Sequence, residues 1–377
     1  MNHPEETLPP IGTRPVERGL RERPHERLLS AEVYWYNHRD WLHAKGYALR
    51  ARYQEGWTAS WTHTKHVLPS DFEDGVTHLR GNVMDATRIR DGVFVMLKCT
   101  SKRQHPSEVE IASFFSAEPQ RSDPRNHCVP IYEVLQTPDN PDKHIVVMPL
   151  LTRYSKPRFD TIGEAVSFFK QIFEALKYMH AQNVAHRDCT ARNIMMDAAP
   201  IFTVPFHPVK PRMKRDFSGR SSPLSRTQHP VRYYLTDFGL SVKYGSEDRP
   251  PLEIPVNGAD KSVPEFQSAE PPAGDPFPVD VYYLGNLIRM DFTEVRKLGF
   301  EFMEPLVADM VNTDPALRPT MVEVVDRFEE IVRGLSNWKL RSRVAKTRDS
   351  FTTFRSIAHW IRRVRLIVGR YHPIPMP

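Results

Sequence analysis

The middle of the chain carries a long helical pattern. Between residues 161 and 180, apolar side chains recur at intervals of three or four positions, which places them on one face of an α-helix. This face consists of Val166, Phe169, Ile172, Phe173, Leu176 and Met179. The pattern predicts a core helix.

Shorter apolar runs before this helix predict β-strands. Residues 82–90 and 92–100 are rich in β-branched and apolar side chains and meet at Asp91-Gly92, a pair typical of hairpin turns. Residues 145–148 read Ile-Val-Val-Met and end at Pro149, which cannot continue a central strand. A strand-rich region therefore precedes a helical one.

Amphipathic segments also flank this region. Residues 31–45 have near-helical apolar spacing before Gly46, and their Trp35 and Trp41 are followed by Trp57 and Trp61. So much aromatic area is costly to leave in water. We expect packing against the neighbouring lobe, with an aromatic ligand box as the alternative. A second helical face lies near the C-terminus, formed by Phe351, Phe354, Ile357, Ile361, Val364 and Val368.

Composition adds two irregular segments. The chain has 377 residues, with 34 Pro against 17 Gly, which indicates more than one core and long irregular stretches. Residues 1–30 are rich in Pro, Arg and Glu and predict a disordered arm. Residues 198–231 combine prolines and basic side chains with Ser218, Ser221 and Ser222. We expect an exposed loop there that either accepts a regulatory phosphate, docks a partner or has no role.

The net charge of +6 is concentrated in the tail. Residues 336–377 contain ten Lys and Arg and one acid, Asp349, so the tail carries +9 and the rest of the chain −3. A basic amphipathic helix can bind an acidic partner or an anionic membrane surface, or it can pack on the protein body. The body itself has no excess of basic residues, so no specific nucleic-acid binding is expected.

The three cysteines, Cys99, Cys128 and Cys189, form no Cys-x-x-Cys pair. Their odd number is atypical of a disulfide framework and favours a reducing compartment. No apolar run has the length of a membrane span, and the N-terminus lacks a secretory pattern. These features predict a cytoplasmic or nuclear protein.

The candidate chemistry lies in residues 186–193, His-Arg-Asp-Cys-Thr-Ala-Arg-Asn, and in the later Asp237-Phe238-Gly239. One carboxylate, Asp188, can accept a hydroxyl proton. Asn193 and Asp237 can hold Mg²⁺ against the phosphates of ATP. The pattern therefore predicts phosphoryl transfer.

These residues resemble the eukaryotic protein-kinase superfamily, and other motifs follow in the same order. They are residues 92–98, which end in Lys98; Val263-Pro264-Glu265; residues 280–285; and residues 314–320, whose Arg318 would pair with Glu265. The resemblance implies an α+β bilobal fold, with a small β-rich N-lobe and a larger, mainly helical C-lobe.

The likeness also sets the expected domain boundaries. We expect an arm at 1–30, a Trp-rich extension at 31–66, a kinase-like domain at 67–335 interrupted at 198–231, and a basic tail at 336–377. The extension is similar to that of a fungal family of kinase-like proteins.

The resemblance implies further site residues. Lys98 would contact the α- and β-phosphates while a helix carboxylate holds it, and Glu108 fits better than Glu110 because Ile111 and Phe115 follow it on the core side. Met148 would lie behind the adenine and Leu150 in the hinge.

The glycine-rich phosphate loop departs from the family pattern. Gly81 lies seventeen residues before Lys98, as the last glycine of the loop should, but Val76 and His78 occupy the earlier glycine positions. A turn glycine without a phosphate-binding role is the alternative for Gly81.

The identity of the acceptor stays open. Thr190 stands where serine/threonine kinases carry Lys, and Thr190-Ala191-Arg192-Asn193 looks more like the tyrosine-kinase loop. Arg192 would then supply the missing catalytic charge.

Three functions therefore remain. The first is an ATP- and Mg²⁺-dependent protein kinase acting on a protein hydroxyl. The second is a pseudokinase that binds a nucleotide or partner. The third, a small-molecule phosphotransferase, is disfavoured by Glu265 and Arg318.

Overall fold

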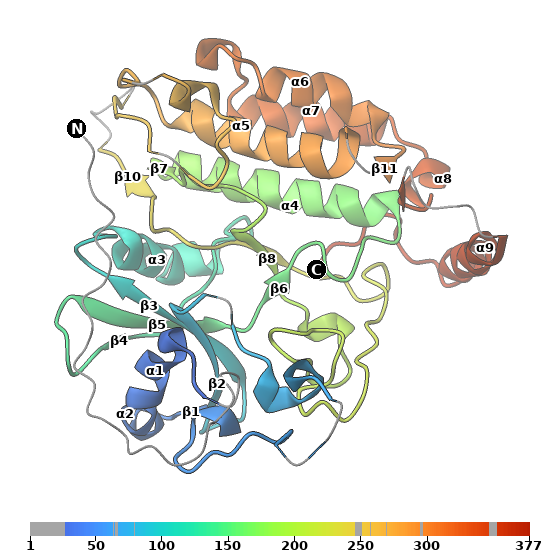
Figure 1. Cartoon of the computed structure of the whole chain (residues 1–377). Helices are drawn as coiled ribbons and strands as arrows, with labels where there is room; N and C mark the ends of the chain where they lie inside the picture. The colour runs from blue at the N-terminus through green and yellow to red at the C-terminus, as the bar shows by residue number, and fades with distance from the viewer. Residues whose placement is uncertain are drawn as a thin grey trace.

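A five-stranded antiparallel sheet forms the N-lobe of the computed structural model (Figure 1). Its strand order is β1-β2-β3-β5-β4. The strands are β1 (Tyr47–Leu49), β2 (Val83–Arg88), β3 (Phe94–Ser101), β4 (Glu133–Gln136) and β5 (Lys143–Pro149). The structure describes residues 27–62, 64, 67–78, 80–245, 251–256, 258–268, 270–294, 297–346 and 353–377. Most of the predicted arm therefore lies outside the described residues.

The extension packs on this sheet and also contributes to it. Helices α1 (Ser30–Asn37) and α2 (Arg39–Ala44) end before Gly46, whose φ of 90° suits a residue without a side chain. Trp35 and Leu42 are fully buried in one cluster with Val95 and Leu97 of β3. Strand β1 pairs with β2, so part of the expected extension is an edge strand of the lobe.

Helices build the C-lobe, which lies above the sheet in Figure 1. The predicted core helix is α4 (Ile162–Ala181), capped by Thr161, whose hydroxyl accepts from the Glu164 backbone N–H at 3.2 Å. Around it lie α5 (Phe277–Ile288), α6 (Glu304–Met310), α7 (Met321–Arg333) and α8 (Asn337–Leu340). With α3 (Glu108–Ser116) against the sheet, the expected bilobal α+β fold is confirmed.

Short strands line the space between the lobes. A three-stranded sheet has the order β6 (Thr152–Arg153), β8 (Ile194–Met196) and β9 (Tyr233–Leu235). The pair of β7 (Val184–Ala185) with β10 (Val242–Lys243) lies near them. A further pair, β11 (Lys297–Leu298) with β12 (Ala345–Lys346), lies at the end of the C-lobe beside α8 (Figure 1). The segments that carry the candidate chemistry lie beside β8 and β9, because residues 186–193 precede β8 and Asp237 follows β9.

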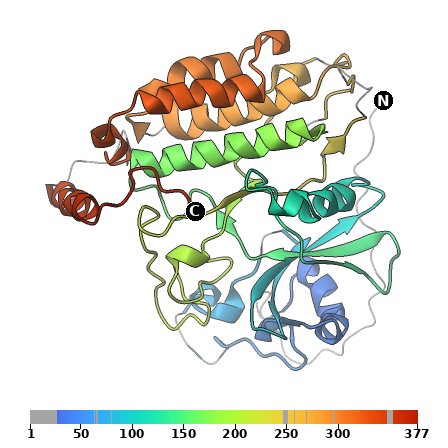
Figure 2. The ribbon, with the colours of Figure 1, turned by 180° about the vertical axis from the view of Figure 1, so that it is seen from behind.

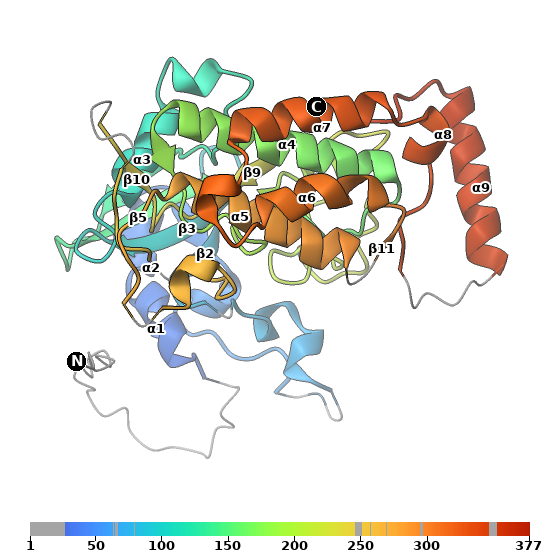
Figure 3. The same cartoon turned by 90° about the horizontal axis from the view of Figure 1, so that it is seen from above.

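The tail forms α9 (Thr353–Val368) at the edge of the C-lobe (Figure 3). Its inner side is fixed by Leu366, which is buried, and by Arg363, which lies 3.2 Å from the Trp338 ring centroid. Ile361, Val364 and Val368 of the predicted apolar face are exposed. Packing of this face on the protein body is therefore not observed for those three residues, and Phe351 lies outside the described residues. Among the described helices, none is long and apolar enough to span a bilayer.

The segment at 198–231 is not the exposed loop that its composition predicts. Ile201, His207 and Arg226 are buried, and the segment lies against residues 69–75 of the N-lobe side in both Figure 1 and Figure 2. The expectation was wrong because its basic side chains find buried carboxylates and carbonyls. Ser218 and Ser222 are exposed, whereas Ser221 is buried.

Candidate active site

Lys98 lies at the centre of the candidate site, on β3. Its Nζ is paired with Glu108 Oε1 of α3 and lies 2.7 Å from Asp237 Oδ1. The Thr100 hydroxyl donates to the other oxygen of Glu108. Burial lowers the pKa of Lys98, but the two carboxylates outweigh it and raise the pKa overall. Lys98 is therefore held charged and aimed at Asp237.

The structure selects Glu108 over Glu110 as the partner of Lys98. Glu108 is buried and Glu110 is exposed. The apolar positions that follow Glu108, Ile111 and Phe115, are buried in the core as expected for this helix face.

Asp280 of α5 accepts hydrogen bonds from the backbone of the loop formed by residues 186–193. Its two carboxylate oxygens accept from the backbone N–H groups of His186 at 2.7 Å and Arg187 at 2.6 Å. Arg187 has a φ of 66°, a conformation that non-glycine residues adopt only at a cost. The buried carboxylate therefore stabilises a strained loop backbone directly before Asp188.

Asp188 receives hydrogen bonds on both oxygens. Asn193 Nδ2 donates to Oδ2 at 2.6 Å, and the backbone N–H of Ala259 donates to Oδ1 at 2.8 Å. Burial raises the pKa of Asp188, and the negative charge of Asp237 adds to the effect. A Cβ added at Gly258 would lie 2.8 Å from Asp188 Oδ1, so this approach of the activation segment requires glycine.

Asp237 and Asn193 lie side by side through the pairing of β8 with β9. Ile194 pairs with Leu235, and the Thr236 backbone N–H donates to the Asn193 carbonyl at 2.8 Å. Burial raises the pKa of Asp237, but the charge of Lys98 outweighs it and lowers the pKa overall. The Asp237 carboxylate is therefore kept ionised, as a metal ligand requires.

Asp237 and Asn193 together supply some, but not all, of the ligands that Mg²⁺ requires. A carboxylate and an amide oxygen are hard ligands suited to Mg²⁺, which usually takes its remaining ligands from phosphates and water. Among the described residues there is no group of three or more His, Cys, Asp and Glu side chains placed to hold a metal. Asn193 and Asp237 could bind Mg²⁺ together with the phosphates of a nucleotide.

A cavity of about 380 Å³ lies beside several of these groups, although Glu108 and Asn193 do not line it. Lys98, Asp188, Asp237 and Gly239 line it, together with Ala259. Of the remaining expected site residues, Met148 on β5 and Leu150 after it are half-buried against the C-lobe core and do not line this cavity. Arg192 is exposed, and Thr190 is buried.

Gly81 does not lie in a short phosphate loop. Residues 50–82 connect β1 to β2 where a tight glycine-rich turn was expected. The Gly81 carbonyl accepts from Trp35 Nε1 at 2.7 Å, and a Cβ at this position would lie 2.8 Å from Ala31 Cβ. Gly81 therefore serves close packing of α1, and sequence reasoning missed the long connection because β1 is only three residues long.

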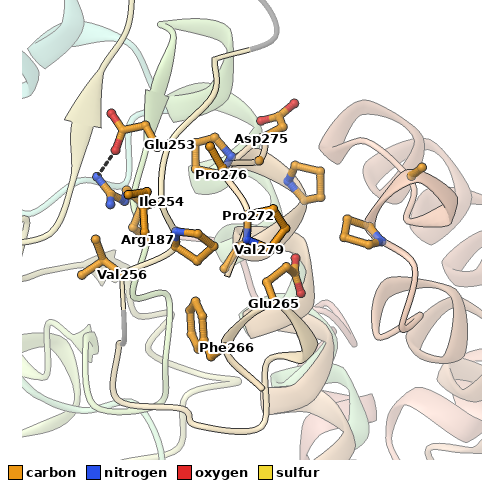
Figure 4. Close-up of a pocket in the computed structure, with 16 residues that line it drawn as sticks. Arg187, Glu253, Ile254, Val256, Glu265, Phe266, Pro272, Asp275, Pro276 and Val279 are labelled. Atoms are coloured by element: carbon orange, nitrogen blue, oxygen red, sulfur yellow. Dashed lines mark ion pairs between the residues drawn. The ribbon is translucent and has the colours of Figure 1, made fainter. Parts of the chain in front are cut away.

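A second, larger cavity of about 420 Å³ lies on the other side of the activation segment (Figure 4). Arg187 reaches its wall, where Nη1 lies 2.9 Å from Glu253 Oε2. Prolines and apolar side chains form most of the remaining wall, including Ile254, Val256 and Phe266. This cavity is larger, but Lys98, Asp188 and Asp237 do not line it. The guanidinium of Arg187 is thus paired with a carboxylate of the same segment that lines this cavity.

The expected pair behind the activation segment is formed. Arg318 donates to both oxygens of Glu265, at 2.6 and 2.8 Å, and to the Asn312 carbonyl at 2.8 Å. Its side chain is fully buried. The pair joins residues 264–266 to the segment before α7.

Comparison with known proteins agrees with this geometry. Residues 79–259 match the protein kinase domain family. The chain is 25% identical over 190 residues to serine/threonine-protein kinase atg1 of Aspergillus oryzae, covering 50% of this chain and 18% of that protein. It is 30% identical over 145 residues to NUAK family SNF1-like kinase 1 of Mus musculus, covering 36% and 22%.

The chain thus spans about a fifth of the length of these relatives. The family match contains Lys98, Asp188 and Asp237, whereas the Glu265–Arg318 pair lies beyond it. The order of the N-lobe strands, the Lys98–Glu108 pair and the matched residues together lead to one assignment: residues 79–259 belong to a domain of the eukaryotic protein-kinase superfamily.

Proposed function

We propose that the protein is an active kinase that transfers the γ-phosphoryl group of ATP to a protein hydroxyl. The observation that carries this proposal is the convergence of Lys98, Asp188 and Asp237 on one cavity, with Lys98 held by Glu108. The named atg1 relative is a serine/threonine kinase, which favours that acceptor class, although the loop containing Thr190 resembles tyrosine kinases.

Each residue of the site has a separate role in the proposed reaction. Asp188 orients the acceptor hydroxyl and takes its proton as the oxygen bonds to phosphorus and the bond to the ADP oxygen breaks. Lys98 contacts the α- and β-phosphates. Asn193 and Asp237 would hold Mg²⁺, which offsets phosphate charge when bound. Met148 would lie behind the adenine, Leu150 in the hinge, and Arg192 would supply charge at the acceptor. Gly81, expected as the last glycine of the phosphate loop, packs against α1 and is given no nucleotide contact in this proposal.

A pseudokinase is the second candidate, because a long connection replaces the glycine-rich turn. Incubation of the full chain with labelled ATP, Mg²⁺ and a generic protein acceptor separates the two. Label on Ser, Thr or Tyr of the acceptor supports the kinase and identifies the hydroxyl. Nucleotide binding without transfer supports the pseudokinase.

We also propose a location and a partner. All three cysteines are free, which fits a cytoplasmic or nuclear protein. Helix α9 exposes Ile361, Val364 and Val368 next to exposed arginines, a combination suited to an anionic membrane surface, with an acidic protein partner as the competing outcome.

A further inference from the structure

Residues 198–231 form a strap that is fixed to the C-lobe. Arg226 Nη2 donates to the carbonyls of Tyr154 at 2.9 Å and Pro157 at 2.6 Å. Thr227 donates from its backbone N–H and its hydroxyl to Glu164 Oε1 of α4, at 3.1 and 2.9 Å. These buried contacts fix the C-terminal part of the strap.

Backbone hydrogen bonds shape the other end of the strap. His207 N–H donates to the Met213 carbonyl at 2.9 Å, Lys214 N–H to Gly219 at 2.9 Å, and Arg215 N–H to Pro205 at 2.8 Å. The resulting turn presents His207, Lys210 and Arg215 to the N-lobe.

The strap meets the N-lobe in a buried charge cluster around Asp85 of β2, whose side chain has no exposed surface. Its carboxylate lies 2.6 Å from Arg215 Nη2, 3.2 Å from Arg50 Nε and 2.8 Å from His78 Nε2. Burial raises the pKa of Asp85, but Arg50 and the other cations lower it strongly overall. Asp85 is thus an ionised carboxylate that links the strap, which is fixed to the C-lobe, to the sheet of the N-lobe.

The connection that replaces the glycine-rich turn takes part in the same cluster. Within it, Glu73 Oε1 lies 2.9 Å from Arg50 Nη1 and 3.6 Å from His207 Nε2 of the strap. Lys210 Nζ donates to the Ser70 carbonyl at 2.5 Å. Residues 50–82 are therefore bound by the strap of the C-lobe as well as by residues of the N-lobe.

The cluster lies on the face of the sheet that bears Lys98. Val83 pairs with Lys98 and Asp85 with Met96, and alternate residues of a strand share a face. Arg215 also lies over the Phe94 ring, 4.5 Å from its centroid, two pairs further along β3 on this face. The strap therefore contacts β2 and β3 on the face that covers the candidate nucleotide site. We call this face of the two strands the roof of the site.

We propose that the strap positions this roof, and that Arg215 is a positioning residue for nucleotide binding. This inference rests on the proposed kinase function for its nucleotide. In the usual fold a glycine-rich turn approaches the phosphates; here the roof strand is fixed in place through Asp85 by a segment of the opposite lobe. Ordering the roof in advance reduces the conformational entropy that nucleotide binding would otherwise cost.

Arg215→Ala tests the proposal, because Asp85 keeps Arg50 and His78 as partners and the carboxylate is not left alone. Titration of the full chain with Mg·ADP should show a dissociation constant raised about tenfold. KM for ATP should rise while kcat stays unchanged. The matched control is Arg220→Ala, an exposed arginine of the same strap, which should match the wild type.

Hydrogen exchange distinguishes this proposal from the proposed function. In Arg215→Ala, amides of residues 80–85 should exchange faster with or without nucleotide. Unchanged exchange together with an unchanged Mg·ADP affinity would overturn the strap's role. If the wild type binds no nucleotide, the kinase proposal falls, and the exchange result still decides whether the strap fixes the roof. Lys210→Met gives a milder second variant should Arg215→Ala fold poorly.

Discussion

Single residues in the site are kept in charge states that suit their roles. Lys98 sits between two carboxylates, so its charge is retained despite burial, and Asp237 is held ionised by Lys98. Asp188, by contrast, is half-buried and accepts hydrogen bonds from the Asn193 amide group and the Ala259 backbone N–H, and burial raises its pKa. Two carboxylates with opposed pKa shifts match a base and a metal ligand.

The first prediction concerns Asp237→Asn. Phosphoryl transfer should fall on the order of a hundredfold or more, since the metal loses its charged ligand. The fold should persist, because Asp237 has a φ of 68° and asparagine tolerates this region. Turnover of labelled ATP and the melting temperature are the two measurements. Wild-type turnover in this variant would refute the metal role.

The second prediction is a pH dependence set by Asp188. Only the deprotonated carboxylate can take the acceptor proton, so activity is lost as pH falls through its pKa. Because burial raises that pKa, the acid limb of kcat/KM should lie above the ordinary aspartate value of about 3.9. Circular dichroism at each pH would exclude unfolding as the cause. A limb at or below the ordinary value contradicts this environment for Asp188.

At the scale of elements, the activation segment is fixed at two places by ion pairs. Glu253 pairs with Arg187 of the catalytic loop, and Glu265 pairs with the fully buried Arg318. Arg318 of the second pair also donates to two backbone carbonyls, those of Asn312 and Pro278. Removing one partner of such a pair leaves a charge without compensation.

The third prediction is that Arg318→Ala lowers the melting temperature by several degrees, because breaking a buried pair on one side costs about 3–5 kcal/mol. Arg327→Ala is the control: its pair with Asp309 is also 2.6 Å long but exposed, and such pairs contribute about 1 kcal/mol or less. Thermal unfolding of both variants makes the comparison. Equal stability of the two would mean that burial of the Arg318 pair has no energetic consequence.

The sequence predicts elements well where periodicity is local. The core helix, the strands around Asp91-Gly92 and the catalytic loop all lie where their patterns put them. It fails where partners are distant: Arg215 and Asp85 are 130 positions apart, and their ion pair leaves Arg215 half-buried where the composition predicts exposure. Strand β1 is too short to show a period, so the long connection after it was not foreseen.

In the molecule as a whole, three segments outside the common kinase fold make buried contacts with it. The extension packs on the sheet, the strap joins the lobes, and the chain end returns to α4, where the Pro375 carbonyl accepts from the Ser167 hydroxyl. Helix α9 lies between α8 and this last contact, and Figure 3 shows it at the edge of the C-lobe. Its outward face is left without a partner among the described residues.

The last prediction tests this face. Ile361, Val364 and Val368 are 51%, 53% and 75% exposed, so replacing all three with serine should leave the melting temperature unchanged. The wild type should sediment with vesicles of phosphatidylserine and phosphatidylcholine, and the triple variant should not. Added salt should weaken the binding, since each basic residue near a charged bilayer contributes about 1 kcal/mol. Because burial of the apolar face and attraction of the arginines are both needed, vesicles of phosphatidylcholine alone should bind neither form. Equal sedimentation of both forms would show that the apolar face has no role, and absence of wild-type binding would leave an acidic protein as the surface to be sought.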